Sequence, residues 1–151
     1  MQLSANTLGV VGLLSMDYFD TAAHIKSHQL VGFFEGWPNP PSQDTHLQIL
    51  RNSAHVVLAT QPAGQVVGFA TAVSDGVLSA YISFLEVLRP YRRQGIGTRL
   101  VRGLLQQLSG LYSVNLHCDA EIEPFYKSLG MRPLSGMAIR DYSAQPGRHT
   151  A

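Results

Sequence analysis

The chain has 151 residues, of which 45% are hydrophobic and 14% are charged, and its net charge is +1. This length is typical of one domain with a sizeable core, and the hydrophobic content argues against a disordered chain. A nucleic-acid-binding domain normally carries a large basic excess, which is missing here. No apolar run is close to the length of about 18 residues that a membrane-spanning helix needs. The single cysteine, Cys118, excludes an intrachain disulfide and a multi-cysteine metal site.

The two ends of the chain differ from its middle in patterning. Residues 1–14 lack the basic region and the small-residue cleavage site of a secretory signal, and we expect a weakly structured extension there. One domain is expected over residues 15–142, followed by a disordered tail over residues 143–151. We expect a cytoplasmic location, with no metal and no nucleic-acid or membrane partner. A homodimer is left open.

The first third of the domain predicts one strand and two helices. A short strand is expected over residues 15–20. Ser27 is expected to cap a helix that carries Leu30, Phe33 and Phe34. The prolines at positions 38, 40 and 41 stop this helix, and Ser42 then caps a second one.

Three β-rich runs follow. The runs over residues 54–60 and 66–73 are separated by Gln-Pro-Ala-Gly, which predicts a hairpin. Residues 78–88 are apolar at both odd and even positions, as expected of a strand that is covered on both faces.

The last third alternates helices and strands. Leucines at helical spacing predict a helix that contains Leu100, Leu104, Leu105 and Leu108. We expect a strand over residues 113–118, a short helix that begins near Glu121 because of Pro124, and one or two closing strands over residues 131–142. This order of elements predicts an α/β or α+β sandwich with a mixed sheet.

The charges are distributed unevenly. Residues 1–86 have a net charge of −4, residues 87–118 contain five arginines and no acidic residue, and residues 119–151 have a net charge of zero. A solvated helix face is one explanation of the arginines, and a site for a small anion is the other.

The segment Arg92-Arg93-Gln94-Gly95-Ile96-Gly97-Thr98 favours the anion site. It joins a buried strand to an amphipathic helix, whose first turn presents unpaired N–H groups and a positive dipole end. Glycine allows a ligand to approach the backbone closely. A dinucleotide-binding turn would need glycine where Leu100 stands, and a P-loop would need a lysine that the turn lacks.

This segment resembles the motif Gln/Arg-x-x-Gly-x-Gly/Ala of the GNAT superfamily of N-acetyltransferases, with matches at Arg92, Gly95 and Gly97. Residues 119–131 are similar to a second segment of that family, in which a tyrosine corresponds to Tyr126. The matched region runs from about Val66 to Met131. The resemblance implies one GNAT-type domain, with a mixed, mostly antiparallel sheet of six to seven strands and about four helices.

The resemblance also implies acetyl-CoA as the cosubstrate and direct transfer of acetyl to a primary amine in a ternary complex. The acceptor would be a small amine, a polyamine, or the amine of a lysine or peptide. The residues that would bind acetyl-CoA are Val87, Leu88, Arg92, Arg93, Gln94, Gly95, Ile96, Gly97 and Thr98. A catalytically silent CoA-binding module and a protein N-terminal acetylase are the alternatives.

Three residues are candidates for moving protons. By the resemblance, Tyr126 would donate a proton to the leaving thiolate, and the alternative is an aromatic side chain packed in the core. Glu86 is the one charged residue in an apolar run, on the parity of Ile82, Phe84 and Leu88, and is a candidate general base. Its alternative is an ion pair with an arginine. His117 is a second candidate base, and a chain of water molecules is a third possibility.

Other side chains carry weaker signals. By the resemblance, whose family places its first helices and their loop over the acceptor, Phe33 and Trp37 are expected at the acceptor site, with ordinary packing as the alternative. His24 and His28 lack the glutamate and the third ligand of a zinc site. Cys118 follows His117 directly, and neighbouring side chains of a strand point to opposite faces, which argues against a nucleophile.

Overall fold

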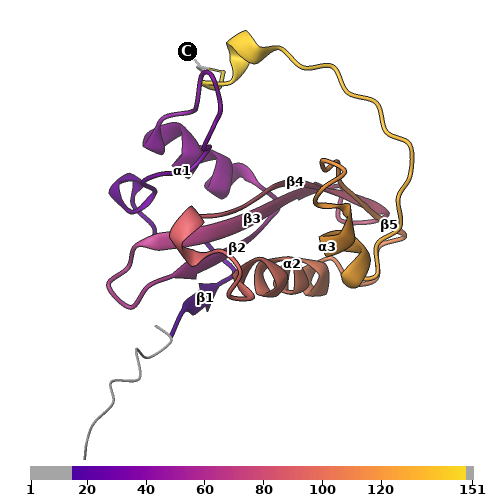
Figure 1. Cartoon of the computed structure of the whole chain (residues 1–151), viewed down its shortest axis with the longest axis horizontal. Coiled ribbons are helices and arrows are strands. Elements are labelled where there is room, and N and C mark those ends of the chain that lie inside the picture. The colour runs from indigo at the N-terminus through magenta and orange to yellow at the C-terminus, as the bar shows by residue number, and fades with distance from the viewer. Residues whose placement is uncertain (1–14, 149–151) are drawn as a thin grey trace, which may run out of the picture.

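The computed structural model describes residues 15–148. The N-terminal extension expected over residues 1–14 lies outside the described residues. The elements follow the chain from the first strand to a short 3-10 helix near the C-terminal end (Figure 1). They are β1 (Asp17–Phe19), η1 (Ser27–Gln29), α1 (Gln43–Asn52), β2 (His55–Thr60), β3 (Val66–Ser74), β4 (Ser79–Val87), η2 (Arg89–Tyr91), α2 (Ile96–Gln107), β5 (Ser113–Asn115), α3 (Glu123–Ser128) and η3 (Tyr142–Ala144).

The strands form one mixed sheet in the order β1-β2-β3-β4-β5. The first four strands are antiparallel to their neighbours, and β5 is parallel to β4. The predicted mixed, mostly antiparallel sheet is therefore confirmed. The expected number of elements is wrong, because residues 15–148 contain five strands and three α-helices.

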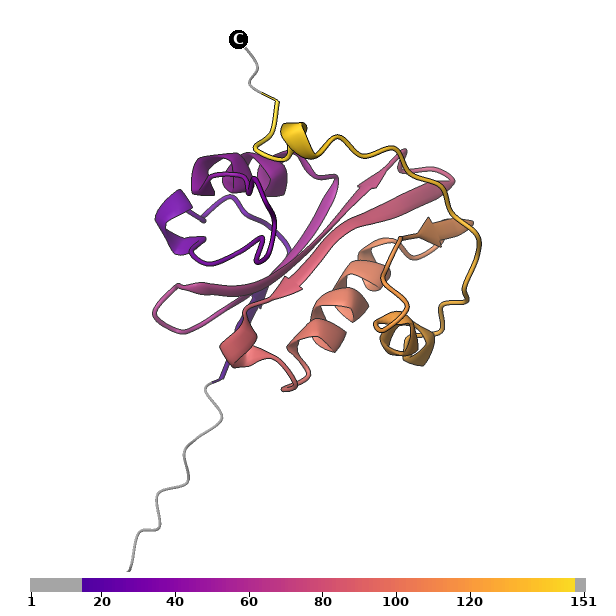
Figure 2. The ribbon, with the colours of Figure 1, turned by 45° about the horizontal axis from the view of Figure 1, so that its top comes forward.

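Each face of the sheet is covered by different elements (Figures 1 and 2). On one face α2 packs its apolar side, which includes the fully buried Leu100 and Leu104, against β2, β3 and β4. On the other face Ile25, Leu30 and Leu50 pack with Phe69 of β3. Burial of a large aliphatic side chain contributes about 1.5–3 kcal/mol, so these two layers stabilise the sheet from both sides.

A β-bulge at Ser83 changes which side chains of β4 share a face. Ile82 pairs with Ala72 and Phe84 pairs with Thr71, so Ser83 has no partner of its own on β3. Beyond the bulge the alternation of side chains is shifted by one residue. Tyr81 therefore faces the same side as Phe84, whereas Ile82 belongs to the layer under α2. The expectation that Glu86 shares a face with Ile82 is wrong for this reason.

The helix expected after Ser27 is a single 3-10 turn. Lys26 precedes it as the N-cap residue, and η1 ends at Gln29. The following backbone adopts positive φ at Gly32 (92°) and at Phe34 (61°). A helix cannot continue through such residues, so Phe33 and Phe34 lie in a loop. By contrast, Ser42 caps α1 as predicted, with its side chain accepting a hydrogen bond from the N–H of Thr45.

The strands expected over residues 131–142 do not form. The segment runs instead as an extended connection from α3 past β5 to the N-terminal elements (Figure 2). Pro133 has no N–H to donate to a sheet, and the apolar side chains of Leu134, Met137 and Ile139 are all exposed. At its end, the backbone N–H of Asn39 donates to Gln145 and the Asn39 side chain donates to the carbonyl of Tyr142. The strand expected over residues 113–118 is also shorter, because pairing ends at Asn115.

His46 of α1 is a polar side chain in the apolar layer. It is 1% exposed, and neither ring nitrogen has a hydrogen-bond partner. The rings of Phe33, Phe34 and Phe69 surround it, with centroid separations of 5.2, 4.9 and 4.4 Å. Burial disfavours the charged imidazole and lowers its pKa from 6.5 to about 4.

We predict that His46 makes the protein sensitive to acid. The unfolded chain binds more protons than the folded one between these two pKa values, so the contribution of the neutral ring is complete above pH 6.5 and is lost as the pH falls towards 4. The loss amounts to about 3 kcal/mol by linkage. Urea unfolding between pH 7 and pH 4.5 should show this decline, and His46→Leu should flatten it. The exposed His28→Gln is the control, and an equal decline in wild type and His46→Leu would contradict the prediction.

Candidate active site

The candidate site lies where β4 and β5 separate. The two strands pair only through residues 79–81 of β4 and residues 113–115 of β5. Beyond Tyr81, β4 continues to Val87 without β5 beside it, and the two strands diverge (Figure 2). The opening leads to the turn before α2, which contains most of the residues that the sequence assigned to cofactor binding.

The turn before α2 presents backbone N–H groups to solvent. Gly95 is the N-cap residue of α2 and adopts a left-handed conformation (φ 81°), which glycine tolerates best. No side chain caps the helix, and its first turn has no acidic residue, so the N–H groups of Ile96, Gly97 and Thr98 face outward at the positive end of the dipole. A Cβ at Gly95 would meet no atom within 4 Å. This arrangement suits a phosphate.

Gly97 lies beside α3. A Cβ at Gly97 would be in ordinary van der Waals contact with the ring of Phe125, at 3.7 Å, so α3 approaches the start of α2 at this point. Ile96, also assigned to the cofactor by the sequence, buries its side chain under the sheet and offers only its backbone.

The arginines of the turn have different partners. The Nε of Arg92 donates to the carbonyl of Val87 (2.7 Å), and its guanidinium pairs with Glu35 at 3.2 Å. Arg89 also pairs with Glu35. Arg93 is exposed, with a positive φ of 61°. Glu35 therefore ties the N-terminal loop to the turn, and Arg93 is left facing solvent beside Gly95.

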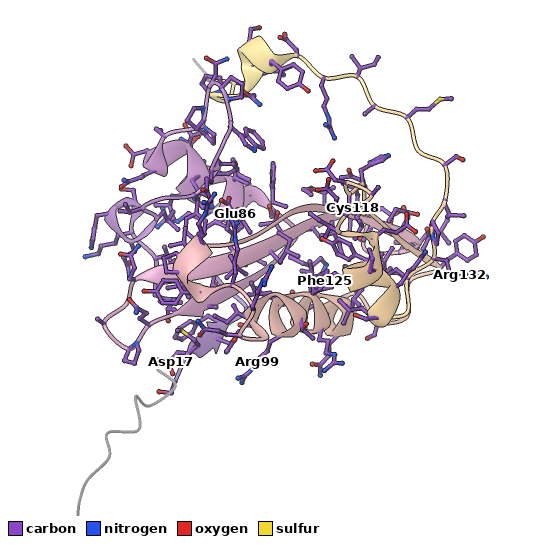
Figure 3. All side chains as sticks on the ribbon, in the orientation of Figure 1. Asp17, Glu86, Arg99, Cys118, Phe125 and Arg132 are labelled. Carbon is purple, nitrogen blue, oxygen red and sulfur yellow. The ribbon has the colours of Figure 1, made fainter. Side chains whose placement is uncertain are left out.

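Glu86 also holds the N-terminal loop. Its two carboxylate oxygens accept hydrogen bonds from the backbone N–H groups of Phe34 (2.8 Å) and Glu35 (3.2 Å). Figure 3 shows Glu86 where β4 meets the N-terminal segment. The side chain that the sequence suggested as a base thus fixes the loop, and the expected alternative, an ion pair between Glu86 and an arginine, is absent among the described residues.

Tyr126 of α3 is buried on the other side of the opening. Burial raises the pKa of its phenol to about 12, and Cys118 adds to this shift. The phenol consequently stays protonated at neutral pH and is able to donate a proton. Figure 3 shows Cys118 above α3, on the side of the site opposite Glu86.

His117 follows β5 and contacts β4. Its Nδ1 lies 2.7 Å from the hydroxyl of Tyr81, and the ring itself is exposed. A Cβ at Gly136 would come within 2.1 Å of its Nε2, so the C-terminal segment confines the ring from the other side.

Two cavities adjoin the site. The larger, of about 530 Å³, is lined by Trp37 and its neighbours, by β4 and by the C-terminal segment. The smaller, of about 290 Å³, is lined by Phe33 and His46 at the start of α1. The two residues predicted at the acceptor site, Phe33 and Trp37, therefore line different cavities.

Several lining residues of the larger cavity were missed by the sequence analysis. They are Tyr81, Ser83, Phe84, Arg140, Asp141, Tyr142 and Gln145. The β4 residues were missed because the bulge shifts the parity on which the sequence argument relied. The C-terminal residues come to the cavity through an irregular segment, for which the sequence has no periodic signal.

In residues 15–148, no helix is both long and apolar enough to cross a membrane. The same residues contain no group of three or more His, Cys, Asp or Glu side chains that would hold a metal ion.

Comparisons with known proteins agree on one family. The model of the "Acetyltransferase (GNAT) family" matches residues 22–131. A crystal structure from Deinococcus radiodurans, described as that of an acetyltransferase, is 44% identical, with a TM-score of 0.87 over 89% of this chain and 94% of that one. An aminoglycoside N-acetyltransferase in complex with CoA is 18% identical and shares the fold, with a TM-score of 0.60 over 84% of this chain and 94% of that one.

The curated relatives are longer proteins. "GCN5-related N-acetyltransferase 3, chloroplastic" of Arabidopsis thaliana is 36% identical over 50% of this chain and 33% of its own length. An uncharacterized N-acetyltransferase of Pyropia yezoensis is 28% identical over 63% of this chain and 57% of its own length. The chain thus spans a third to somewhat over half of these two relatives. The Arabidopsis relative is named as a chloroplast protein, so a cytoplasmic location stays a prediction.

We predict that Glu86→Gln loosens the loop at Phe34 and Glu35. The amide keeps one acceptor oxygen but turns an NH₂ donor towards a backbone N–H, and a buried hydrogen bond lost in this way costs about 1–3 kcal/mol. Amide hydrogen exchange at Phe34 and Glu35 should accelerate in the variant, while exchange in α2 stays unchanged. Glu123→Gln in α3, which removes an exposed ion pair with Lys127, is the control. Unaltered protection of both amides would show that Glu86 does not anchor the loop.

Proposed function

The chain belongs to the GNAT family of acetyltransferases, and we propose that it transfers an acetyl group from acetyl-CoA to a primary amine in a ternary complex. The observation that carries this proposal is the turn before α2, where an open left-handed glycine, uncapped N–H groups and Arg93 form a site suited to phosphate. The larger cavity adjoins the opening between β4 and β5, since Tyr81, the last residue of β4 that pairs with β5, lines it.

The proposed path of acetyl-CoA follows these features. Its pyrophosphate would lie on the N–H groups of residues 95–98, with Arg93 and Gln94 beside it. Its pantetheine arm would enter the opening along Val87 and Leu88. Arg92 supports this site by holding the turn to the carbonyl of Val87.

The reaction needs a neutral amine, donors for the thioester oxygen and a proton for the leaving thiolate. A backbone N–H of the unpaired part of β4 is suited to the oxygen. Tyr126 is proposed as the acid, since its burial keeps the phenol protonated. An alkylammonium has a pKa near 10.4, so the amine must lose a proton before it attacks.

The larger cavity is proposed as the acceptor site. Its volume of about 530 Å³ falls within the about 300–1,000 Å³ of small-molecule sites, which favours a small amine over a protein. The negative net charge of the N-terminal half is weaker evidence for a cationic acceptor. Glu35 is already paired with an arginine, and Glu86 already accepts a hydrogen bond from a backbone N–H group.

The proposed function is tested by measuring thiol release from acetyl-CoA with a panel of primary amines, polyamines and basic peptides. We expect release that depends on the amine and is fastest with small amines. Binding of acetyl-CoA without release across the whole panel would favour a silent CoA-binding module. Absence of binding would overturn the assignment of the turn.

We predict that Gly95→Asp weakens acetyl-CoA binding at least about tenfold more than Gly95→Asn. Both side chains tolerate the left-handed conformation, and only aspartate adds a negative charge beside the pyrophosphate. Calorimetry with acetyl-CoA measures the difference. Equal affinities of the two variants would place the pyrophosphate elsewhere.

We predict that Tyr126→Phe lowers kcat by about 10²-fold and leaves the affinity for acetyl-CoA unchanged, since only a proton donor is removed. The exposed Tyr112→Phe is the control. Steady-state kinetics and calorimetry test the two statements, and an unchanged kcat would exclude Tyr126 as the acid.

A further inference from the structure

The proposed function requires a group that takes a proton from the acceptor amine, and the inference that follows rests on that function. Glu86 is not among the residues that line the larger cavity, and its carboxylate holds the backbone of the N-terminal loop. A base must instead face the larger cavity and have an exit for the proton.

Tyr81 meets the first requirement. The bulge at Ser83 turns its side chain to the face of Phe84 and Glu86, and Tyr81 lines the larger cavity. It is also the last residue of β4 that pairs with β5, opposite Asn115. The phenol therefore stands at the point where the two strands begin to separate.

His117 meets the second requirement. Its Nδ1 is 2.7 Å from the Tyr81 hydroxyl, and the residue is exposed to solvent. Imidazole is the side chain that exchanges protons near neutral pH. A neutral phenol alone is too weak a base to take a proton from an ammonium. The contact with imidazole gives the phenol a nitrogen to which it can pass its own proton at the same time.

The pair and the proposed acid come from different elements. His117 follows β5 and contacts Tyr81 of β4, and Tyr126 belongs to α3, the next helix after β5. The proposed base and the proposed acid are therefore separate side chains that different variants can remove.

We propose that Tyr81 and His117 act together as the general base. The Tyr81 oxygen accepts a proton from the bound ammonium while its own proton passes to Nδ1 of His117, which yields a neutral amine, a neutral phenol and an imidazolium. The amine nitrogen then forms a bond to the acetyl carbon, the carbon–sulfur bond breaks, and the thiolate takes the proton of Tyr126. The nitrogen loses its second proton as the amide forms, and an equivalent proton returns through water to the Tyr126 phenolate, which restores the acid. The imidazolium returns its extra proton to water.

Other titratable and charged groups surround the pair. Arg140, Asp141 and Tyr142 line the same cavity from the C-terminal segment. One oxygen of Asp141 accepts hydrogen bonds from the backbone and hydroxyl of Ser143. Cys118 follows His117 directly, and Tyr126 belongs to α3. None of these side chains is altered in the variants below, so their titration is common to all the profiles.

The test compares wild type, Tyr81→Phe, His117→Gln and the double variant in pH profiles of kcat/KM between pH 6 and 10. Two acceptors are used, an alkylamine and a weakly basic amine such as trifluoroethylamine. With the alkylamine at pH 7, each single variant should lose about 10²-fold, and the double variant should lose no more than a single one. The loss should shrink towards pH 10 and should be small with the weakly basic amine, which is already neutral in solution.

Matched controls separate a base from a structural role. Tyr112→Phe and His24→Gln change exposed side chains away from the cavity and should behave as wild type. Calorimetry should show unchanged acetyl-CoA affinity in all variants. A loss that is equal at all pH values and for both amines would assign the pair a structural role and overturn the proposal.

The remaining outcomes are equally decisive. Full activity of either single variant would also overturn the proposed pair while leaving the acetyltransferase assignment intact. A wild-type protein that binds acetyl-CoA but acetylates no amine would overturn the proposed function and this proposal with it.

Discussion

The arrangement of the site depends on one unpaired residue in the middle of the sheet. The bulge at Ser83 lets β4 stay hydrogen-bonded to β3 on both sides while the alternation of its side chains changes. Without the extra residue, Tyr81 would point under α2 and Ile82 would point into the cavity. The bulge thus keeps an apolar side chain in the core and a polar one in the site, which a regular strand of this sequence is unable to do.

Two carboxylates connect the cavity to the turn before α2. Glu86 holds the backbone of the N-terminal loop, and Glu35 of that loop reaches back to Arg89 and Arg92. The wall of the cavity that contains Trp37 is therefore fixed to the turn on which acetyl-CoA is proposed to bind. The ion pairs are exposed and individually weak, whereas the hydrogen bond from the N–H of Phe34 to Glu86 is partly buried and sets the path of the chain through Phe34.

Sequence patterns predicted the parts of the fold that depend on interactions between residues close in sequence. The glycine turn and the leucines of α2, the hairpin between β2 and β3, and the cap at Ser42 all depend on residues close in sequence. Sequence patterns gave wrong predictions where contacts between residues far apart in the sequence determine the backbone conformation. The loop at Phe34 follows the hydrogen bonds to Glu86, the bulge follows the register with β3, and the segment after α3 lacks a pairing partner. For the same reason the sequence offered His117 and Tyr126 as candidates, whereas Tyr81 is proposed only from the structure.

The environments of the two proposed proton carriers fit their opposite tasks. An acid that acts once per turnover on the leaving thiolate must hold its proton until the carbon–sulfur bond breaks, and burial of Tyr126 stabilises its protonated form. A base must instead give its proton to water after each cycle, and this requires exposure to solvent. His117 is exposed. Both environments follow the end of β5, whose pairing with β4 stops at Asn115. His117, two residues beyond, is exposed and contacts Tyr81 of β4, whereas Tyr126 lies on α3 with its side chain buried. The end of the short strand β5 thus leaves one side chain at the surface beside β4 before the chain turns into the helix that buries the other.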